Sequence, residues 1–410
     1  MKTNLPEDYC WNFSQKLLFR FLSVYLFLYS VPDFLLKGIL WNSLIPWTGK
    51  HILGIFVINL GSNGSGDTTY NYVQVFCILI LAISCALIWS AIDRKRKNYD
   101  KLLYWVLVYT RYYLATMMLV YGIAKIIPTQ FIFPSLARLV QPLGESSPMG
   151  LAWNFMGYSA GFTIFTGLAE ALGGFLLFFR RTSTFGALIS ITVLSNVVAI
   201  NFFYDVPVKL FSAHLLLMAI AIVLPDIPRL IRFFFSNKDV SAKKAPPVEL
   251  KKWMRTARII IKSILIIAVV GTQVRTGLKN KKMMAELTNT PLDGIYEVST
   301  FERNNQLIPP LTTDSTRWDL LIIDWNGYAT VKMITGELRR HQISIDTLSR
   351  KIKWENTTSL TYEETGENLL TIKGRIINDS VTIRFRKKDP REFTLVNRGF
   401  RWINEYPFNR

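Results

Sequence analysis

The chain has 410 residues, half of them hydrophobic, and its 48 Lys and Arg against 29 Asp and Glu give a formal net charge of +19. Basic and acidic residues nearly balance after Pro291, so the excess belongs to the hydrophobic part of the chain, where it orients helices in a lipid bilayer and argues against nucleic acid as a partner. The three cysteines, Cys10, Cys77 and Cys85, all precede Pro291, and no metal site is expected because nothing here has zinc-ligand spacing.

Long apolar segments dominate the first two thirds of the chain, and each approaches the ~20 helical residues that cross a hydrocarbon core of ~30 Å. The predicted spans are residues 17–36, 72–92, 102–127, 158–179, 185–203, 206–224 and 258–277. Arg20 is expected to extend to the membrane interface at the inner end of the first span, and Pro32 and Asp33 interrupt its other end. Residues 51–60 are too short to cross and are predicted to be an interfacial or re-entrant piece.

Lys and Arg fall in alternate gaps between these spans, at residues 93–97, 180–181 and 229–258. Because cytoplasmic loops carry the Lys and Arg excess, the alternation predicts a cytoplasmic N-terminus and seven spans that leave the C-terminal domain outside. The basic run at residues 279–282 falls outside in this arrangement and counts against it.

Changes in pattern divide the chain into four regions. They are an N-terminal membrane region with two spans and an outer loop (residues 1–101), a four-helix core (102–225), a basic linker with the seventh span (226–289) and a C-terminal domain (290–410). A long apolar outer segment at residues 128–157 is expected either to cover a pocket as a lid or to lie in the membrane interface.

The C-terminal domain changes to short segments with alternating polarity. The predicted strands are residues 295–301, 318–323, 328–334, 342–346, 351–355, 360–363, 369–376, 380–386, 392–396 and 400–403. Many short strands without helices between them favour an antiparallel, lipocalin-like barrel, and an open sandwich is the alternative. Bulky aromatic residues predict a mostly packed interior, and the aromatic tail at residues 398–410 is expected to pack back onto the barrel or the bundle.

Ionisable residues lie inside several of the spans, where they are costly and commonly functional. Arg111 and Glu170 are near the middle of their spans and are predicted to form a buried structural ion pair. Gly167, Gly173 and Gly174 recur on the face of Glu170, which predicts a close neighbouring helix and an interior position for this carboxylate.

A second polar group lies toward the outer face of the third, fifth and sixth spans. Its members are Tyr121, Lys125, Asn196, Asn201, Asp205, Lys209 and His214. Their convergence from three helices predicts an outward-facing binding pocket, in which Lys125, His214 and Glu170 are the candidate catalytic groups. The alternatives are that Lys125 and Lys209 only extend to the interface and that His214 is a hydrogen-bonded structural residue.

These segments resemble the DoxX-like family of bacterial membrane proteins, in a longer form with an extracytoplasmic C-terminal domain. The resemblance rests on residues 122–125 (GIAK), 147–150 (SPMG), 155–157 (FMG), 167–170 (GLAE), 173–174 (GG), 180–182 (RRT) and 204–209 (YDVPVK). It covers the third to sixth spans, and it implies the bacterial inner membrane with a periplasmic C-terminal domain. It also implies a link to quinone-coupled redox chemistry, because relatives include a small subunit of thiosulfate:quinone oxidoreductase.

Two functions of different classes follow. In the first, the bundle binds a quinone or an isoprenoid lipid, and Lys125 or His214 donates a hydrogen bond to a head-group oxygen. Electrons then come from the bound molecule or a redox partner protein, because the sequence has no haem ligand pair, flavin motif or CxxC. In the second, a non-enzymatic envelope protein anchors the barrel in the membrane and binds a partner or lipid. Whether the chain is an enzyme stays open at this point.

Overall fold

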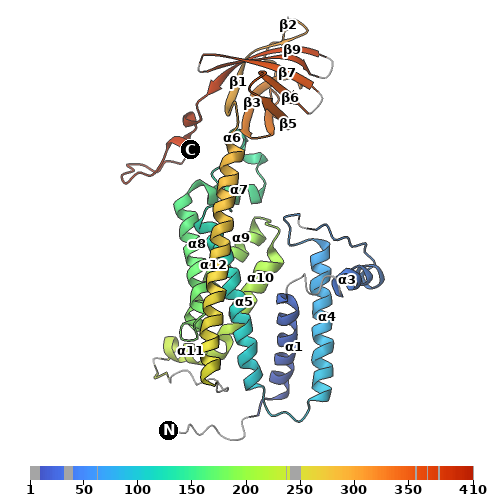
Figure 1. The fold of residues 1–410 in the computed structure, drawn as a ribbon, viewed down its shortest axis with the longest axis vertical. Coiled ribbons are helices and arrows are strands. Elements are labelled where there is room, and N and C mark those ends of the chain that lie inside the picture. The colour runs from blue at the N-terminus through green and yellow to red at the C-terminus, as the bar shows by residue number, and fades with distance from the viewer. Residues whose placement is uncertain are drawn as a thin grey trace. The chain divides into compact units, whose positions relative to one another are not determined.

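The computed structural model describes residues 10–31, 40–61, 63–236, 238–240, 251–355, 358–366, 368–376 and 379–409. The chain divides into two compact units (Figure 1). The first comprises Met1–Gln130 and Gly161–Gly277, and the second comprises Phe131–Ala160 and Leu278–Arg410.

The first unit is a bundle of helices. Its elements are α1 (Phe13–Ser30), α3 (Asn42–Thr48), the π-helix η2 (Gly49–Leu53), α4 (Thr69–Ile92), α5 (Asp100–Ile126), α8 (Ala160–Leu177), α9 (Ser183–Phe203), α10 (Lys209–Val223), η4 (Leu224–Asp226), α11 (Ile227–Phe235) and the first part of α12 (Lys252–Thr288). Within the described ranges, six helices are long and apolar enough to cross a membrane: α4, α5, α8, α9, the continuous α10–α11 segment and α12. The chain is a multi-pass membrane protein.

Helix α1 covers the start of the remaining predicted span, and residues 32–36 of that span lie outside the described residues. It packs beside α4 (Figure 1). The Arg20 side chain is buried within the protein and donates to the Tyr99 hydroxyl at 3.0 and 2.7 Å. A further bond from Arg20 reaches Ser90 of α4, so this arginine joins α1 to the connection between α4 and α5.

Glycines bring α5 and α8 into close contact. A Cβ added at Gly167 would lie 2.7 Å from the Gly122 carbonyl oxygen, and one at Gly122 would lie 2.8 Å from the Ala171 amide nitrogen. On the adjoining side of α8, Gly173 faces Ser190 of α9. The predicted close approach of a neighbouring helix is confirmed, and it occurs on two sides of α8.

The second unit contains a closed β-barrel. Its strands are β1 (Gly294–Arg303), β2 (Gln306–Leu307), β3 (Trp318–Trp325), β4 (Tyr328–Met333), β5 (Leu338–Asp346), β6 (Lys351–Trp354), β7 (Thr358–Thr365), β8 (Leu369–Ile376) and β9 (Asp379–Lys388). Consecutive strands pair antiparallel, β9 returns to pair with β1, and β2 extends only from β1. Eight strands therefore close the barrel, which confirms the predicted lipocalin-like shape over an open sandwich.

The barrel interior is filled with side chains from alternate strand positions. Trp318 and Trp354 stack with ring centroids 5.1 Å apart, and Phe385 lies beside Trp318. These rings belong to one continuous buried cluster that includes residues of all eight barrel strands. The prediction of a mostly packed interior holds for these three aromatic residues.

The end of the chain differs from its prediction. The expected strand at residues 392–396 is instead η5 (Pro390–Glu392) followed by α13 (Thr394–Asn397), and residues 400–403 form no strand. Phe400 and Trp402 of the tail do not pack against the barrel, because they are 78% and 91% exposed.

The segment between α5 and α8 belongs to the barrel unit. It forms α6 (Leu136–Val140), η3 (Leu143–Glu145) and α7 (Pro148–Tyr158). Leu136, Ala137 and Val140 pack against a small buried cluster of Ile295, Leu320 and Ile322. The segment expected to be a lid or an interfacial loop is therefore a bound part of the C-terminal unit.

Candidate functional site

A buried ion pair joins α5 to α8. Lys125 Nζ donates to both carboxylate oxygens of Glu170, at 2.9 and 2.7 Å, and the two side chains are 8% and 5% exposed. Glycine packing explains the pairing, because Lys125 Cβ faces Gly167 and Glu170 follows Gly167 by one helical turn. The interior position predicted for Glu170 is correct, but its partner is Lys125 rather than Arg111.

Tyr121 flanks this pair from the preceding turn of α5. Lys125 Nζ lies 6.0 Å from the Tyr121 ring centroid, and the tyrosine is 39% exposed. An ammonium group has three N–H donors, of which Glu170 takes two. Among the described residues, Glu170 is the only hydrogen-bond acceptor of Lys125 Nζ, so one donor is available for a further acceptor.

His214 of α10 is held by two tyrosines of α1. Its Nδ1 lies 2.6 Å from the Leu210 carbonyl oxygen and its Nε2 lies 2.6 Å from the Tyr25 hydroxyl. A carbonyl only accepts, so Nδ1 carries a proton, and in the neutral ring Nε2 accepts from Tyr25. Tyr29 stacks on the imidazole with centroids 3.8 Å apart. This arrangement matches the structural alternative for His214.

Three of the remaining predicted residues form hydrogen bonds apart from the Lys125–Glu170 pair. Asn201 donates to the Ser212 hydroxyl at 2.9 Å, and Lys209 Nζ donates to Asp205 at 2.7 Å. Asn196 is exposed and takes part in neither contact. The residues of the expected pocket therefore do not form one group. The most deeply buried ion pair that includes one of them is that of Lys125 with Glu170.

Sequence reasoning missed three residues that organise these pairs. Tyr25 and Tyr29 share a helical face by their i, i+4 spacing, and that spacing was the available signal. Asp67, before α4, accepts hydrogen bonds from the amides of Lys209 and Leu210 at 2.7 and 3.0 Å, and so binds the start of α10. Its position in a polar loop gave no comparable signal.

Comparison with known proteins gives a match over part of the chain. No family model and no solved structure matches the chain. It is 31% identical over 126 residues to the uncharacterized protein YwoB of Bacillus subtilis (strain 168), and the match covers 30% of this chain and 79% of YwoB. The chain belongs to the YwoB family. In this YwoB-family member, the segment of similarity is less than a third of the whole sequence.

Arg111 is the remaining ionisable residue predicted inside the bundle of this YwoB-family chain. Its guanidinium carbon lies 5.5 Å from the ring centroid of Tyr112, the next residue. Its Nε is buried and has no hydrogen-bond partner in the part of the chain that the structure describes. Arg111 therefore stands apart from Glu170, and the Lys125–Glu170 pair is the best candidate site.

Proposed function

We propose that this membrane protein binds the head group of a quinone or an isoprenoid lipid at the Lys125–Glu170 pair, in a redox-linked role. The observation that supports the proposal is the burial of the pair between two membrane helices. Ionisable groups inside a membrane protein are costly unless paired, and they commonly mark a functional site.

The chemistry of the pair suits a head-group oxygen. The third N–H of Lys125 is free to donate to a carbonyl or hydroxyl oxygen, and the ammonium stabilises negative charge that develops there when a quinone is reduced. Glu170 holds the Lys125 side chain in position by accepting two hydrogen bonds from it. Tyr121, which is partly exposed, forms the side from which a ligand enters. Electrons come from a partner protein or a second small molecule.

The proposal includes membership of the DoxX-like family, based on the motif resemblance around residues 122–125 and 167–170. It also includes an inner-membrane location with the N-terminus in the cytoplasm and the barrel in the periplasm. The alternation of basic loops supports that orientation.

The experiment is mass spectrometry of lipids extracted from purified protein. A Lys125→Met/Glu170→Leu double variant removes both charges together, so neither is left unpaired, and it should lose the co-purifying quinone or isoprenoid lipid. Lys209→Met is the matched control, because this lysine also forms an ion pair but at the start of α10. Equal ligand retention in the wild type and the double variant would contradict the proposal.

A second function is favoured by the barrel itself. Its interior is packed, and residues 131–160, which lie between α5 and α8 in the chain, belong to the same unit as the barrel. These features suit a non-enzymatic protein that presents a rigid barrel to a partner. In that case the double variant retains the cellular function of the wild type, whereas removal of residues 290–410 abolishes it.

A further inference from the structure

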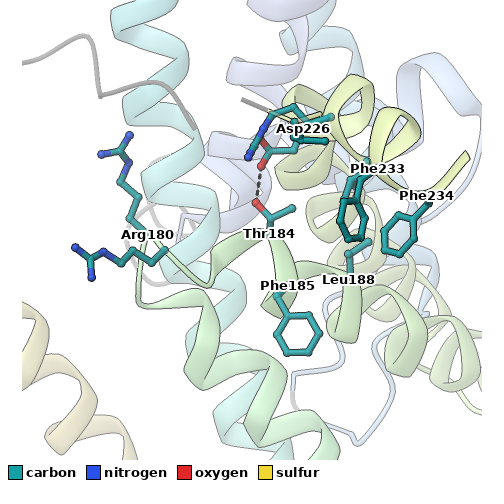
Figure 2. A pocket seen from close by; sticks show the side chains of 11 residues that line it. Arg180, Thr184, Phe185, Leu188, Asp226, Phe233 and Phe234 are labelled. Atoms are coloured by element: carbon teal, nitrogen blue, oxygen red, sulfur yellow. Dashed lines mark hydrogen bonds and ion pairs between the residues drawn. The ribbon is translucent and has the colours of Figure 1, made fainter. Parts of the chain in front are cut away.

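A cavity of about 860 Å³ lies where the turn between α8 and α9 meets α11. Figure 2 shows that basic side chains line one part of it and aromatic side chains another. Arg180 and Arg181 come from the turn and Arg229 from α11, while Phe233 and Phe234 follow on α11. None of these residues takes part in the Lys125–Glu170 site.

Hydrogen bonds fix the basic part of the cavity. The Thr184 hydroxyl donates to the buried carboxylate of Asp226 (Figure 2), and Arg229 Nη1 donates to the other oxygen of Asp226 at 3.3 Å. The Arg229 Nε is buried without a hydrogen-bond partner among the described residues. The residues that line the cavity thus include three arginines and one carboxylate, so the lining has a net positive charge and is suited to an anion.

The apolar part of the cavity is suited to acyl chains. Phe233 and Phe234 are 63% and 62% exposed, and Phe185 at the start of α9 is also exposed. Clustered exposed aromatic residues mark an interaction surface or contact with lipid. Here they continue helices that are apolar enough to cross a membrane, so the guanidinium groups lie near the ends of those helices.

We propose that this cavity binds an anionic phospholipid, with its phosphate at Arg180, Arg181 and Arg229 and its acyl chains along Phe185, Phe233 and Phe234. Arginine pairs well with phosphate because its planar fork donates two parallel hydrogen bonds. Basic recesses between membrane helices bind phospholipid head groups in this way. The cavity volume of about 860 Å³ is sufficient for a head group and the start of its chains.

The test is native mass spectrometry of the full-length protein in detergent, with dioleoylphosphatidylglycerol and dioleoylphosphatidylcholine. The two lipids have the same chains and the same phosphate, and only the first has a net negative charge. The wild type should retain one molecule of phosphatidylglycerol in preference to phosphatidylcholine. Arg229→Gln should weaken that binding by about fivefold, the contribution of one basic residue at an anionic lipid surface.

Two further variants make the result specific. Arg232→Gln, on the same helix but not lining the cavity, should bind as the wild type does, and Arg229→Lys should recover part of the affinity. If Arg229→Gln does not fold, the double variant Arg180→Gln/Arg181→Gln replaces it. Equal retention of both lipids, or equal loss in Arg229→Gln and Arg232→Gln, overturns the proposal. Displacement of the lipid by an excess of inorganic phosphate identifies a free phosphate site instead and also overturns it.

Discussion

The backbone N–H of Ala137 donates a hydrogen bond to Asp324 Oδ2 at 3.1 Å, across 187 residues of sequence. Ala137 is the second residue of α6, and Asp324 is near the end of β3. Because the first amides of a helix lack partners within it, a carboxylate at this position caps α6. The barrel therefore supplies the cap for a helix from which it is separated in the chain by four membrane helices.

Replacement of Asp324 should weaken the attachment of α6 to the barrel. Asp324→Ala removes the acceptor and should raise the rate of tryptic cleavage after Arg138 severalfold, because a hydrogen bond to a charged group contributes about 1.5–3 kcal/mol. Asp324→Asn keeps an acceptor oxygen and should cleave at a rate close to the wild type. Similar rates for Asp324→Ala and the wild type would show that the apolar contacts of α6 alone hold the segment.

Removal of one partner of the Lys125–Glu170 pair should destabilise the protein more than removal of both. A single buried charge left without its partner costs about 3–5 kcal/mol, whereas a well-packed apolar pair of similar volume is often neutral. We expect Lys125→Met to lower the unfolding temperature in detergent and Lys125→Met/Glu170→Leu to recover most of the loss. An additive loss in the double variant would argue against a coupled pair.

The contact between α5 and α8 should be intolerant of a single methyl group. Gly167→Ala places a Cβ against the Gly122 backbone at 2.7 Å, so the helices must separate, at a cost of about 1–3 kcal/mol. Gly271→Ala is the matched control, because a Cβ at this position in α12 meets nothing within 4 Å. The unfolding temperature should fall for the first variant only.

The pairing of β1 with β9, which closes the barrel, should be less stable in acid. Glu297 of β1 accepts hydrogen bonds from Lys388 at 2.8 Å and Arg386 at 3.3 Å, and the bond from Lys388 is the main cause that lowers the pKa of Glu297 below its ordinary value of 4.5. A lowered carboxyl pKa gives stability that is present above the ordinary value and is lost as the pH falls through the value in the folded state.

This pH dependence is measurable on a fragment of residues 292–410, which contains every barrel strand and should fold alone, with a strand-rich circular dichroism spectrum and no disulfide. Its urea midpoint should fall from pH 5 to pH 3, a range of about two units around the ordinary carboxyl pKa. In Glu297→Gln the midpoint should be lower at neutral pH and should change less over this range. If the urea midpoint changes with pH to the same extent in both proteins, other groups cause the acid sensitivity.

Labelling of single cysteines tests the orientation and the role of α1. Cysteines placed at Ser147 and Leu348 should react with an impermeant maleimide from outside, and those at Asn98 and Ser236 should not. The native Cys10, which is exposed, decides whether α1 crosses. With the barrel outside, Cys10 is protected if α1 is a seventh span and labelled if only the six apolar helices cross.

The helices and most strands could be predicted from the sequence because each depends on a local pattern. Residues 369–376 were predicted as a strand with the observed bounds of β8. The partner of Glu170 was not predictable, because counting residues along a span gives depth but not rotation of the helix. That rotation is set by Gly122 against Gly167, a contact between two helices.

The last two predicted strands failed for a different reason. Residues 392–396 and 400–403 alternate in polarity as strands do, but a strand needs an edge with which to pair. In this barrel β9 already pairs with both β8 and β1, so closure leaves no edge for a further strand at its end.

Closure of the barrel between its first and last strands also has a consequence for biosynthesis. Val298 of β1 lies opposite Phe385 of β9, so the ring of strands is incomplete until nearly the whole domain has been made. Until then both edges are open, and such intermediates are prone to aggregate. A premature stop codon before Asp379 should therefore leave an unfolded domain that proteases remove, whereas a stop codon after Lys388 should leave the barrel whole.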